Sequence, residues 1–437
     1  MRIDQLKVSN FKGFKEASFT FHPQFNLLIG ENGSGKTALL EALSVALGGW
    51  FLGMDGMETR NILHSEVHLA MNGLSTGEMK PRSSVHWERY YPCYIQAAGE
   101  VSGVVQRWTR TLAKPNDFNM LSGNNIQKYS RDAQNLILLN RKFELPLIGY
   151  YGTGRLWNSS NPSSDGEVAF LTKEETSRLF PYRSAFHPRI SLTDLTRWIM
   201  DQTLIGLQFG EESTLWGVVQ QAMVHCLEGA KSIYYNFKVK SILIEFSDGS
   251  VHSFDTLSDG QRTMLAMVAD MASKAVQLNS HLGEQVLQET KGVVLIDELD
   301  LHLHPRWQQH VIEDLTTLFP KVQFMASTHS PFLIQSLRDG GQLIDLQGNS
   351  ADSLDNLGIE TIAAGIMGVK NPEAHPRYMA MLEAAKEYLS ELSEAESTAG
   401  EQLEAYKQKL SQRLAPFAQN PAFQAVLEME RLSRLGG

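Results

Sequence analysis

The sequence has few cysteines, no long apolar run and no excess of positive charge, and each shortage excludes a class of protein. Cys93 and Cys226 are the only cysteines among 437 residues and form no paired ligand motif, so neither a disulfide framework nor a zinc hook is supported. No apolar run approaches the ~20 residues that a membrane span needs. The opening residues, Met1 to Asp4, predict a strand rather than a signal peptide. We therefore expect a cytoplasmic protein without membrane association.

The charge balance is acidic. The chain carries 39 Lys and Arg against 49 Asp and Glu, a formal net charge of −10. Such a surface is not that of a general nucleic-acid binder, although the net charge does not exclude a local basic groove. There is no long heptad array and no internal repeat, which argues against an extended coiled coil. The length allows two or three compact units.

A phosphate-binding loop is present near the start. Residues 30–37 read Gly-Glu-Asn-Gly-Ser-Gly-Lys-Thr, the pattern G-x-x-x-x-G-K-T. An apolar run at 25–29 predicts a buried strand before the loop, and helical spacing of leucines predicts a helix after it that stops at Gly48. We predict ATP as the ligand, with Mg²⁺ on the Thr37 hydroxyl. The residues that we expect at its phosphates are Asn32, Gly33, Gly35 and Lys36.

A second group of motifs lies about 220 residues further on. Residues 257–262 read Leu-Ser-Asp-Gly-Gln-Arg and open a predicted helix, and the apolar run 293–296 ends in Asp297 and Glu298. We predict that Asp297 holds Mg²⁺, directly or through water, and that Glu298 polarises the attacking water. An apolar run that ends in Asp-Glu also fits any buried strand before a charged turn. The motifs around this run favour the nucleotide site over an ordinary buried strand, because a further predicted strand at 321–326 ends in Ser-Thr-His-Ser-Pro.

In this order the motifs resemble those of ABC-type ATPases, in particular the SMC/RecF-like branch that includes the ATPases of OLD-like and Septu-type defence systems. The resemblance covers roughly residues 1–48 and 240–340. It implies an α/β fold: an ABC-type P-loop ATPase head with a mixed sheet, flanking helices and an antiparallel β-subdomain. We expect an N-terminal ATPase lobe over 1–157, a helical insert over 158–238, a C-terminal ATPase lobe over 239–370, and a helical tail over 371–437 that caps the head or docks a partner.

The resemblance also implies roles for single residues. Ser258, Gly260 and Gln261 occupy the signature motif, which in this family contacts the γ-phosphate bound by the other subunit. Asp300 is the implied D-loop aspartate, and His329 is the implied switch histidine that senses the γ-phosphate. One nucleotide is then enclosed between two chains, so the first implied partner is a second copy in a head-to-tail dimer or higher oligomer.

Several positions depart from the family pattern or stay open. Asp259 stands where many relatives have glycine, which places a carboxylate near bound phosphate. Gln96 falls in a predicted strand, so we expect the 150–155 segment to fill the Q-loop region.

Arg155 is either a phosphate or interface contact or an ordinary loop arginine. Lys12 is either a nucleotide contact or part of a solvated turn. The histidines His302, His304 and His310 fit the D-loop better than a metal cluster.

The remaining segments receive simpler predictions. The tyrosine- and tryptophan-rich hairpin at 84–112 favours sheet packing over a base-stacking platform. We predict an opening strand at 3–11 with neighbours at 17–21 and 25–29, hairpin strands at 84–96 and 103–112, loops at 113–130 and 158–165, a mainly helical region at 167–235, and a hairpin at 242–254.

The chain shows no Toprim-like acidic constellation and no Cys/His nuclease pattern, so it looks like an ATPase without its own effector. In size, in its 150–157 segment and in its short tail it resembles the ATPase subunits of Septu-type antiphage systems. That resemblance implies an HNH-type nuclease subunit as partner and DNA contact through the complex. The alternatives are a RecF/SMC-like DNA-repair ATPase, a transporter's nucleotide-binding subunit and a nucleotide sensor with little turnover. The 10–14 opening and the large insert argue against the transporter.

Overall fold

The computed structural model describes residues 1–72, 86–115, 117, 120–122, 125–156, 177–210, 213–337 and 341–347, and further along 359, 362, 367, 386–390 and 429. The chain divides into two units, Met1–Leu357 and Gly358–Gly437. The loop predicted at 158–165 lies outside the described residues, as does the predicted tail apart from 386–390 and 429, which are helical.

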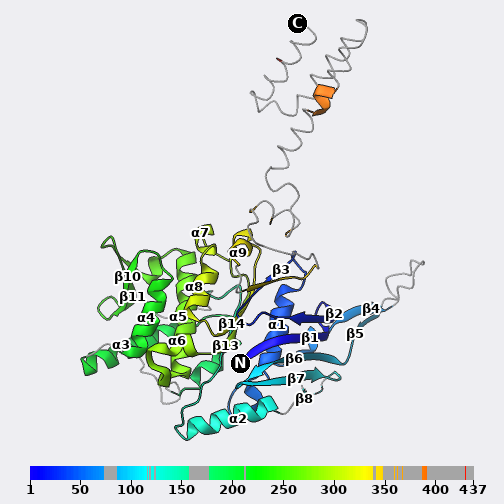
Figure 1. Ribbon diagram of the computed structural model, residues 1–437, viewed down its shortest axis with the longest axis horizontal. Helices are drawn as coiled ribbons and strands as arrows, with labels where there is room; N and C mark the ends of the chain where they lie inside the picture. Colours follow the sequence, from blue (N-terminus) through cyan, green and yellow to red (C-terminus); the bar gives the residue numbers. More distant parts are fainter. Residues whose placement is uncertain are drawn as a thin grey trace. The chain divides into compact units, whose positions relative to one another are not determined.

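A five-stranded parallel sheet forms the centre of the first unit (Figure 1), in the order β15-β3-β14-β13-β9. Strands β3, β13 and β14 are buried along their whole length, as parallel strands covered on both faces are. Their carboxyl ends meet at one edge of the sheet, where ligands of such folds bind. The bounds are β3 Phe25–Ile29, β9 Leu147–Tyr151, β13 Gly292–Ile296, β14 Val322–Ser327 and β15 Gly341–Asp345.

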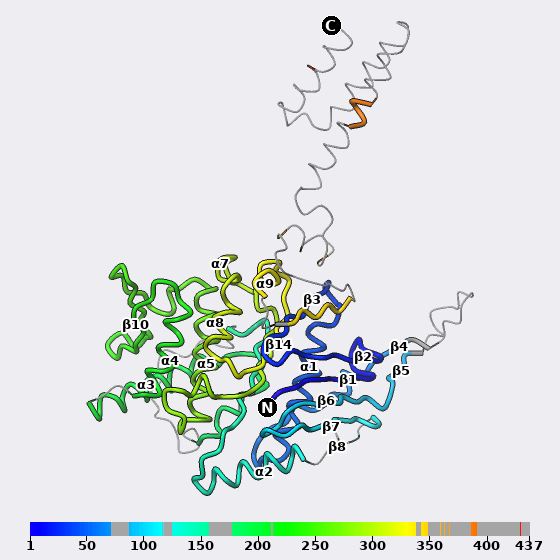
Figure 2. Tube along the Cα trace, in the orientation of Figure 1, coloured from blue at the N-terminus to red at the C-terminus, as the bar shows by residue number. Residues whose placement is uncertain are grey.

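A second, antiparallel sheet has the order β2-β1-β6-β7-β8. Its strands are β1 Arg2–Phe11, β2 Phe14–Thr20, β6 Cys93–Val101, β7 Val104–Leu112 and β8 Met120–Ser122, and a separate pair joins β4 Leu69–Asn72 to β5 His86–Arg89. The expectation that 25–29 neighbours the first strand is wrong, because β3 pairs with β14 and β15. Figure 2 shows the blue β3 beside strands from the far end of the chain.

The helix after the P-loop, α1 Lys36–Leu47, lies between the two sheets, in contact with β1, β6 and β7 on one side and with β13 and β14 on the other. Nine of its twelve residues are buried, as expected for a helix covered all round. Trp108 of β7 donates its indole N–H to the Ala46 carbonyl at 2.9 Å. The helices α4 Thr214–His225, α5 Asp259–Leu278 and α8 Val311–Leu318 lie on the other side of the parallel sheet (Figure 1).

Three predictions outside the motifs need correction. The predicted loop 113–130 contains β8 and the start of α2, Asn125–Leu138. That helix buries only Ile126, Ser130 and Ala133, so its polar composition resembles that of a loop. The predicted strand 84–96 splits into β5 and β6. The region 167–235 contains α3 Leu192–Phe209 and α4, but strand β10, Ala230–Asn236, begins before its end.

The hairpin predicted at 242–254 is confirmed as β11 Ser241–Phe246 and β12 Val251–Ser253. None of the helices in the described ranges is long and apolar enough to cross a membrane. The other helical segments are η1 Phe51–Gly53, η2 His64–Glu66, η4 Phe180–Ser184, η5 Phe254–Thr256, η6 Ser280–Gln285, α6 Val286–Glu289, α7 Pro305–Gln308 and α9 Pro331–Ser336.

Candidate nucleotide-binding site

The P-loop joins β3 to α1 in a conformation that only glycine allows at two points. Gly30 has φ 143° and Gly35 has φ 104°. A Cβ at Gly30 would lie 2.6 Å from the Ser34 hydroxyl, and one at Gly35 would lie 2.8 Å from the Phe14 ring of the β-subdomain. Gly35 caps α1 without a side-chain hydrogen bond. The first N–H groups of α1 are therefore donors for an anion at the positive end of the helix dipole.

The loop also holds a buried cation and a buried hydroxyl. Lys36 is 7% exposed, and its ammonium donates to the carbonyls of Gly30 at 2.7 Å and Glu31 at 3.1 Å. Burial lowers the pKa of Lys36, while Asp297 opposes that shift. The Ser34 hydroxyl is buried and has no hydrogen-bond partner within the described chain. These groups, with the exposed Asn32 and Gly33, fit a phosphate chain.

Asp297 is the point at which the P-loop helix and the strands β13 and β14 meet. It is 4% exposed. One carboxylate oxygen accepts from the Thr37 hydroxyl at 2.9 Å and the other from the Ser327 hydroxyl at 2.6 Å. Hydroxyl and carboxylate oxygens are ligands that suit Mg²⁺. Within the ranges given above, no group of three or more His, Cys, Asp and Glu side chains could hold a metal.

The residues that follow Asp297 form hydrogen bonds with the last residue of β14 and with the segment after it. Glu298 has φ 49°, and its N–H donates to the Ser327 hydroxyl at 2.7 Å. Asp300 accepts from the Thr328 hydroxyl at 2.6 Å and from the His329 N–H at 3.2 Å. The structure thus brings the P-loop, the Asp297–Glu298 pair and the histidine segment to the same edge of the parallel sheet.

The signature residues form the start of α5. Ser258 caps the helix: its hydroxyl accepts from the Gln261 N–H at 3.4 Å, and the Gln261 side chain accepts from the Ser258 N–H at 3.1 Å. A Cβ on Gly260 would lie 2.4 Å from the His302 carbonyl oxygen, so the signature helix packs closely on the D-loop. Asp259 forms an ion pair with Arg262 one turn on, a partner that sequence reasoning missed although its i,i+3 spacing is visible.

Lys12 and Arg155, whose roles the sequence left open, both make contacts with other parts of the chain. Lys12 forms ion pairs with Glu41 of α1 and with Glu66, so it joins the β1–β2 turn to the P-loop helix rather than extending into solvent. Arg155 is 2% exposed, which excludes an ordinary loop arginine. Its guanidinium donates to the main-chain carbonyls of Asp297 and Glu298 at 3.1 and 2.7 Å.

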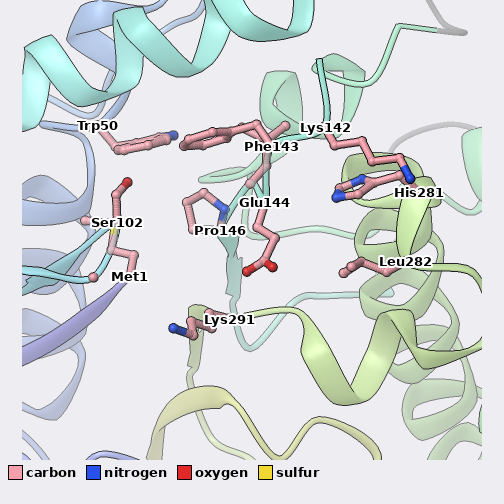
Figure 3. Close-up of a pocket in the computed structure, with 12 residues that line it drawn as sticks. Met1, Trp50, Ser102, Lys142, Phe143, Glu144, Pro146, His281, Leu282 and Lys291 are labelled. Carbon is pink, nitrogen blue, oxygen red and sulfur yellow. The ribbon is translucent and has the colours of Figure 1, made fainter. Parts of the chain in front are cut away.

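A cavity of about 540 Å³ lies at the opposite edge of the parallel sheet. Lys291 directly precedes β13 and Pro146 directly precedes β9, and both line the cavity (Figure 3). Since the strands are parallel, their amino ends lie away from the edge that carries the P-loop. This cavity is therefore separate from the candidate nucleotide site.

Comparison with known families agrees with the motifs. Two AAA domain models match, one over residues 5–197 and the other, whose description adds a type IV toxin–antitoxin system, over residues 107–335. The second spans more than half of the chain, so the chain belongs to the AAA domain family. Its central sheet, flanking helices and antiparallel β-subdomain are those of an ABC-type ATPase head, as predicted from the sequence. The sheet that was expected to be mixed is parallel in the described residues, and the antiparallel strands form separate sheets.

The chain is also similar to proteins named as a retron ATPase and as a Septu protein. It is 23% identical to the "Retron Vc95 probable ATPase" of Vibrio cholerae serotype O1 biovar El Tor, over 77% of this chain and 72% of that one. It is also 23% identical to the "Septu protein PtuA" of Bacillus mycoides (strain KBAB4), over 80% of this chain but 41% of that longer protein.

Two further similarities are to a DNA replication and repair protein and to a solved SMC head. The chain is 24% identical to the "DNA replication and repair protein RecF" of Haemophilus influenzae (strain 86-028NP), over 68% of this chain and 84% of that one. A solved SMC head bound to the C-winged helix domain of ScpA matches with a TM-score of 0.44 at 15% identity, over 78% of this chain and 96% of that one.

Proposed function

We propose that the chain is the ATP-binding and ATP-hydrolysing subunit of an antiphage defence complex. The observation that carries the ATPase part is the double hydrogen bond of Asp297 with Thr37 and Ser327. It joins a P-loop to an acidic strand end at the edge of a parallel sheet, in a family of ATPases. Such an arrangement suits phosphoryl transfer, which depends on positioning and on charge stabilisation.

The roles of the residues follow from their chemistry. Lys36 and the loop N–H groups bind the phosphates, and Thr37 and Asp297 hold the Mg²⁺ ion. Bound Mg²⁺ neutralises the charge that develops on the phosphate oxygens. Glu298 orients and polarises the attacking water, and His329 contacts the γ-phosphate. Asn32, Gly33 and Gly35 complete the phosphate cradle.

The signature residues support an assembly of at least two copies. The side-chain hydrogen bonds of Ser258 and Gln261 in the described residues run between these two residues at the start of α5, and Ser258 is exposed, so its side chain can meet a nucleotide from another chain. Ser258, Gly260 and Gln261 of one copy then close over the P-loop of the next. Groups supplied in trans raise phosphoryl-transfer rates by ~10³–10⁵ in known cases. We expect an isolated copy to hydrolyse ATP slowly.

The defence role rests on the relatives. Proteins named as a retron ATPase and as a Septu protein match three quarters or more of the chain. The complex that we propose pairs this ATPase, in the cytoplasm, with a separate HNH-type nuclease subunit, whose access to DNA changes with the nucleotide state. A RecF-like role in DNA repair is the second candidate, because the RecF relative matches 68% of the chain.

One experiment separates these possibilities. The full chain is purified with and without the products of the neighbouring genes, and ATP affinity, phosphate release and DNA cleavage are measured. ATP-dependent control of cleavage by a copurified nuclease supports the defence role. ATP-dependent DNA binding without any nuclease supports the RecF-like role. Absence of ATP binding in every preparation contradicts the ATPase proposal itself.

A further inference from the structure

Arg155 lies directly behind the acidic pair of the site. It follows β9, the strand that pairs with β13, in the region where the sequence has no obvious Q-loop glutamine. Its Nη1 donates to the Asp297 carbonyl and its Nη2 to the Glu298 carbonyl. One side chain therefore bonds to two consecutive peptide groups of the turn that carries the catalytic candidates.

A buried guanidinium with neutral partners is costly to maintain. Arg155 is 2% exposed, and the two groups to which its guanidinium donates are main-chain carbonyls. Its Nε is buried and unpaired in the part of the chain described here. An apolar side chain of similar size would avoid the desolvation of a charge. Stability alone is therefore a poor reason for an arginine at this place.

The turn that Arg155 contacts has a strained backbone. Glu298 adopts φ 49°, a left-handed conformation that residues with a Cβ rarely adopt. Its N–H is held by the Ser327 hydroxyl and its carbonyl by Arg155. The same Ser327 hydroxyl donates to Asp297. With both peptide groups held, the main chain of Glu298 is fixed, and that sets the direction in which its carboxylate leaves the backbone.

We propose that Arg155 is a positioning residue of the ATPase site, which holds the main chain of Asp297 and Glu298 so that the Glu298 carboxylate meets the attacking water. Arg155 acts through Glu298 and contacts no reacting atom. This inference rests on the proposed ATPase function. A carboxylate displaced by about 1 Å can lose on the order of 10²-fold in rate, whereas the P-loop contacts that bind ATP do not involve Arg155.

The test compares three variants of the full chain, in the preparation that shows phosphate release. Arg155→Met removes both hydrogen bonds at similar volume. Arg155→Lys keeps the charge but lacks the planar guanidinium that donates to two carbonyls at once. Arg178→Met is the matched control, because Arg178 also donates to main-chain carbonyls, those of Leu278 and Phe143. Each variant is measured for ATP affinity, kcat, thermal unfolding and amide exchange of residues 297–303.

We expect Arg155→Met to lower kcat about 30–100-fold, to change the ATP dissociation constant less than about 3-fold, and to speed amide exchange at 297–303. Arg155→Lys falls between it and the parent. Arg178→Met keeps the parental kcat and the parental exchange of that segment. When Glu298→Gln is combined with Arg155→Met, the double variant stays within about 3-fold of Glu298→Gln alone, because both changes affect one group.

Three results overturn the inference: an unchanged kcat in Arg155→Met, a fall in the ATP affinity of that variant well beyond about 3-fold, or an equal loss of kcat in Arg178→Met. A variant that does not fold is replaced by Arg155→Lys, which is read by the same measurements. Failure of the proposed function looks different, because the parent chain then binds no ATP or releases no phosphate. Amide exchange in that case still tests whether Arg155 holds the main chain of Asp297 and Glu298. Unchanged exchange of residues 297–303 in Arg155→Met contradicts that role.

Discussion

The Tyr151 hydroxyl donates a 2.7 Å hydrogen bond to the carboxylate of Asp270 on α5. The same tyrosine accepts the Asp297 N–H at its main-chain carbonyl, at 2.7 Å. A single residue of β9 thus connects the signature helix with the acidic strand end. Asp270 also pairs with Lys274 at 2.8 Å, so the carboxylate is satisfied from two sides inside the head.

Tyr151→Phe tests the importance of that connection. Removing the hydroxyl leaves Asp270 buried with one partner fewer, which we expect to lower the free energy of unfolding by about 1–3 kcal/mol. The ATP affinity stays close to the parental value, since the P-loop is untouched. Urea denaturation provides the measurement. Tyr235→Phe, on strand β10 where the ring packs against Phe237, serves as control, and an equal loss there contradicts the prediction.

Lys36→Ala removes the cation of the P-loop. Charge-assisted bonds to phosphate contribute about 1.5–3 kcal/mol each, so we expect ATP affinity to fall at least about 100-fold while the fold persists. Titration with a fluorescent ATP analogue measures the effect. Lys238→Ala changes an exposed lysine and should bind like the parent. Parental affinity in Lys36→Ala would place the nucleotide elsewhere.

Glu298→Gln keeps the shape of the side chain and removes its basicity. Loss of a general base costs about 10²–10⁴-fold in rate, and ATP remains bound, so we expect slow turnover and accumulation of a closed dimer. Phosphate release and size-exclusion chromatography with ATP report the two effects. Glu284→Gln, at an exposed glutamate, is the control. Parental turnover in Glu298→Gln would mean that another residue activates the water.

Gly260→Ala tests the close contact between the signature helix and the D-loop. In a helix this change usually stabilises by about 1 kcal/mol, but here the new methyl group meets the His302 carbonyl at 2.4 Å. We expect a net loss of about 1–3 kcal/mol from overpacking. Gly217→Ala in α4 has no atom within 4 Å of the new methyl group and should raise stability. Thermal unfolding of the two variants should move in opposite directions.

Burial raises the pKa of the Cys93 thiol to about 12. Between the ordinary thiol pKa and that value the native state binds more protons than the unfolded chain, so this thiol makes stability fall as pH rises through that window. At pH 8 the buried thiol stays protonated. We expect iodoacetamide to leave Cys93 unmodified in the native protein and to alkylate it in urea, with peptide mass spectrometry as readout. Alkylation in the native state at the rate seen in urea would contradict this burial.

The ABC-type fold class was predictable from the sequence because its motifs are local. A glycine loop between an apolar run and a helical run defines its own strand and helix, which the structure shows as β3 and α1. The partners of β3 were not predictable in this way, because Asn26 meets Phe324 from a distance of 298 residues. The burial of Arg155 was also hidden, since its glycine- and threonine-rich surroundings are typical of an exposed loop. The roles proposed for the site residues stay predictions until they are measured.

The placement of β3 affects how the protein can be made. Its parallel neighbours are β14 and β15, which the ribosome produces only after most of the chain has emerged. Contacts between such distant segments form slowly and late. A nascent chain therefore carries its P-loop sequence long before it has the sheet that shapes it. In the ATPase that we propose, the nucleotide site is complete only once translation has passed β14, so translation products that end before β14 would lack it.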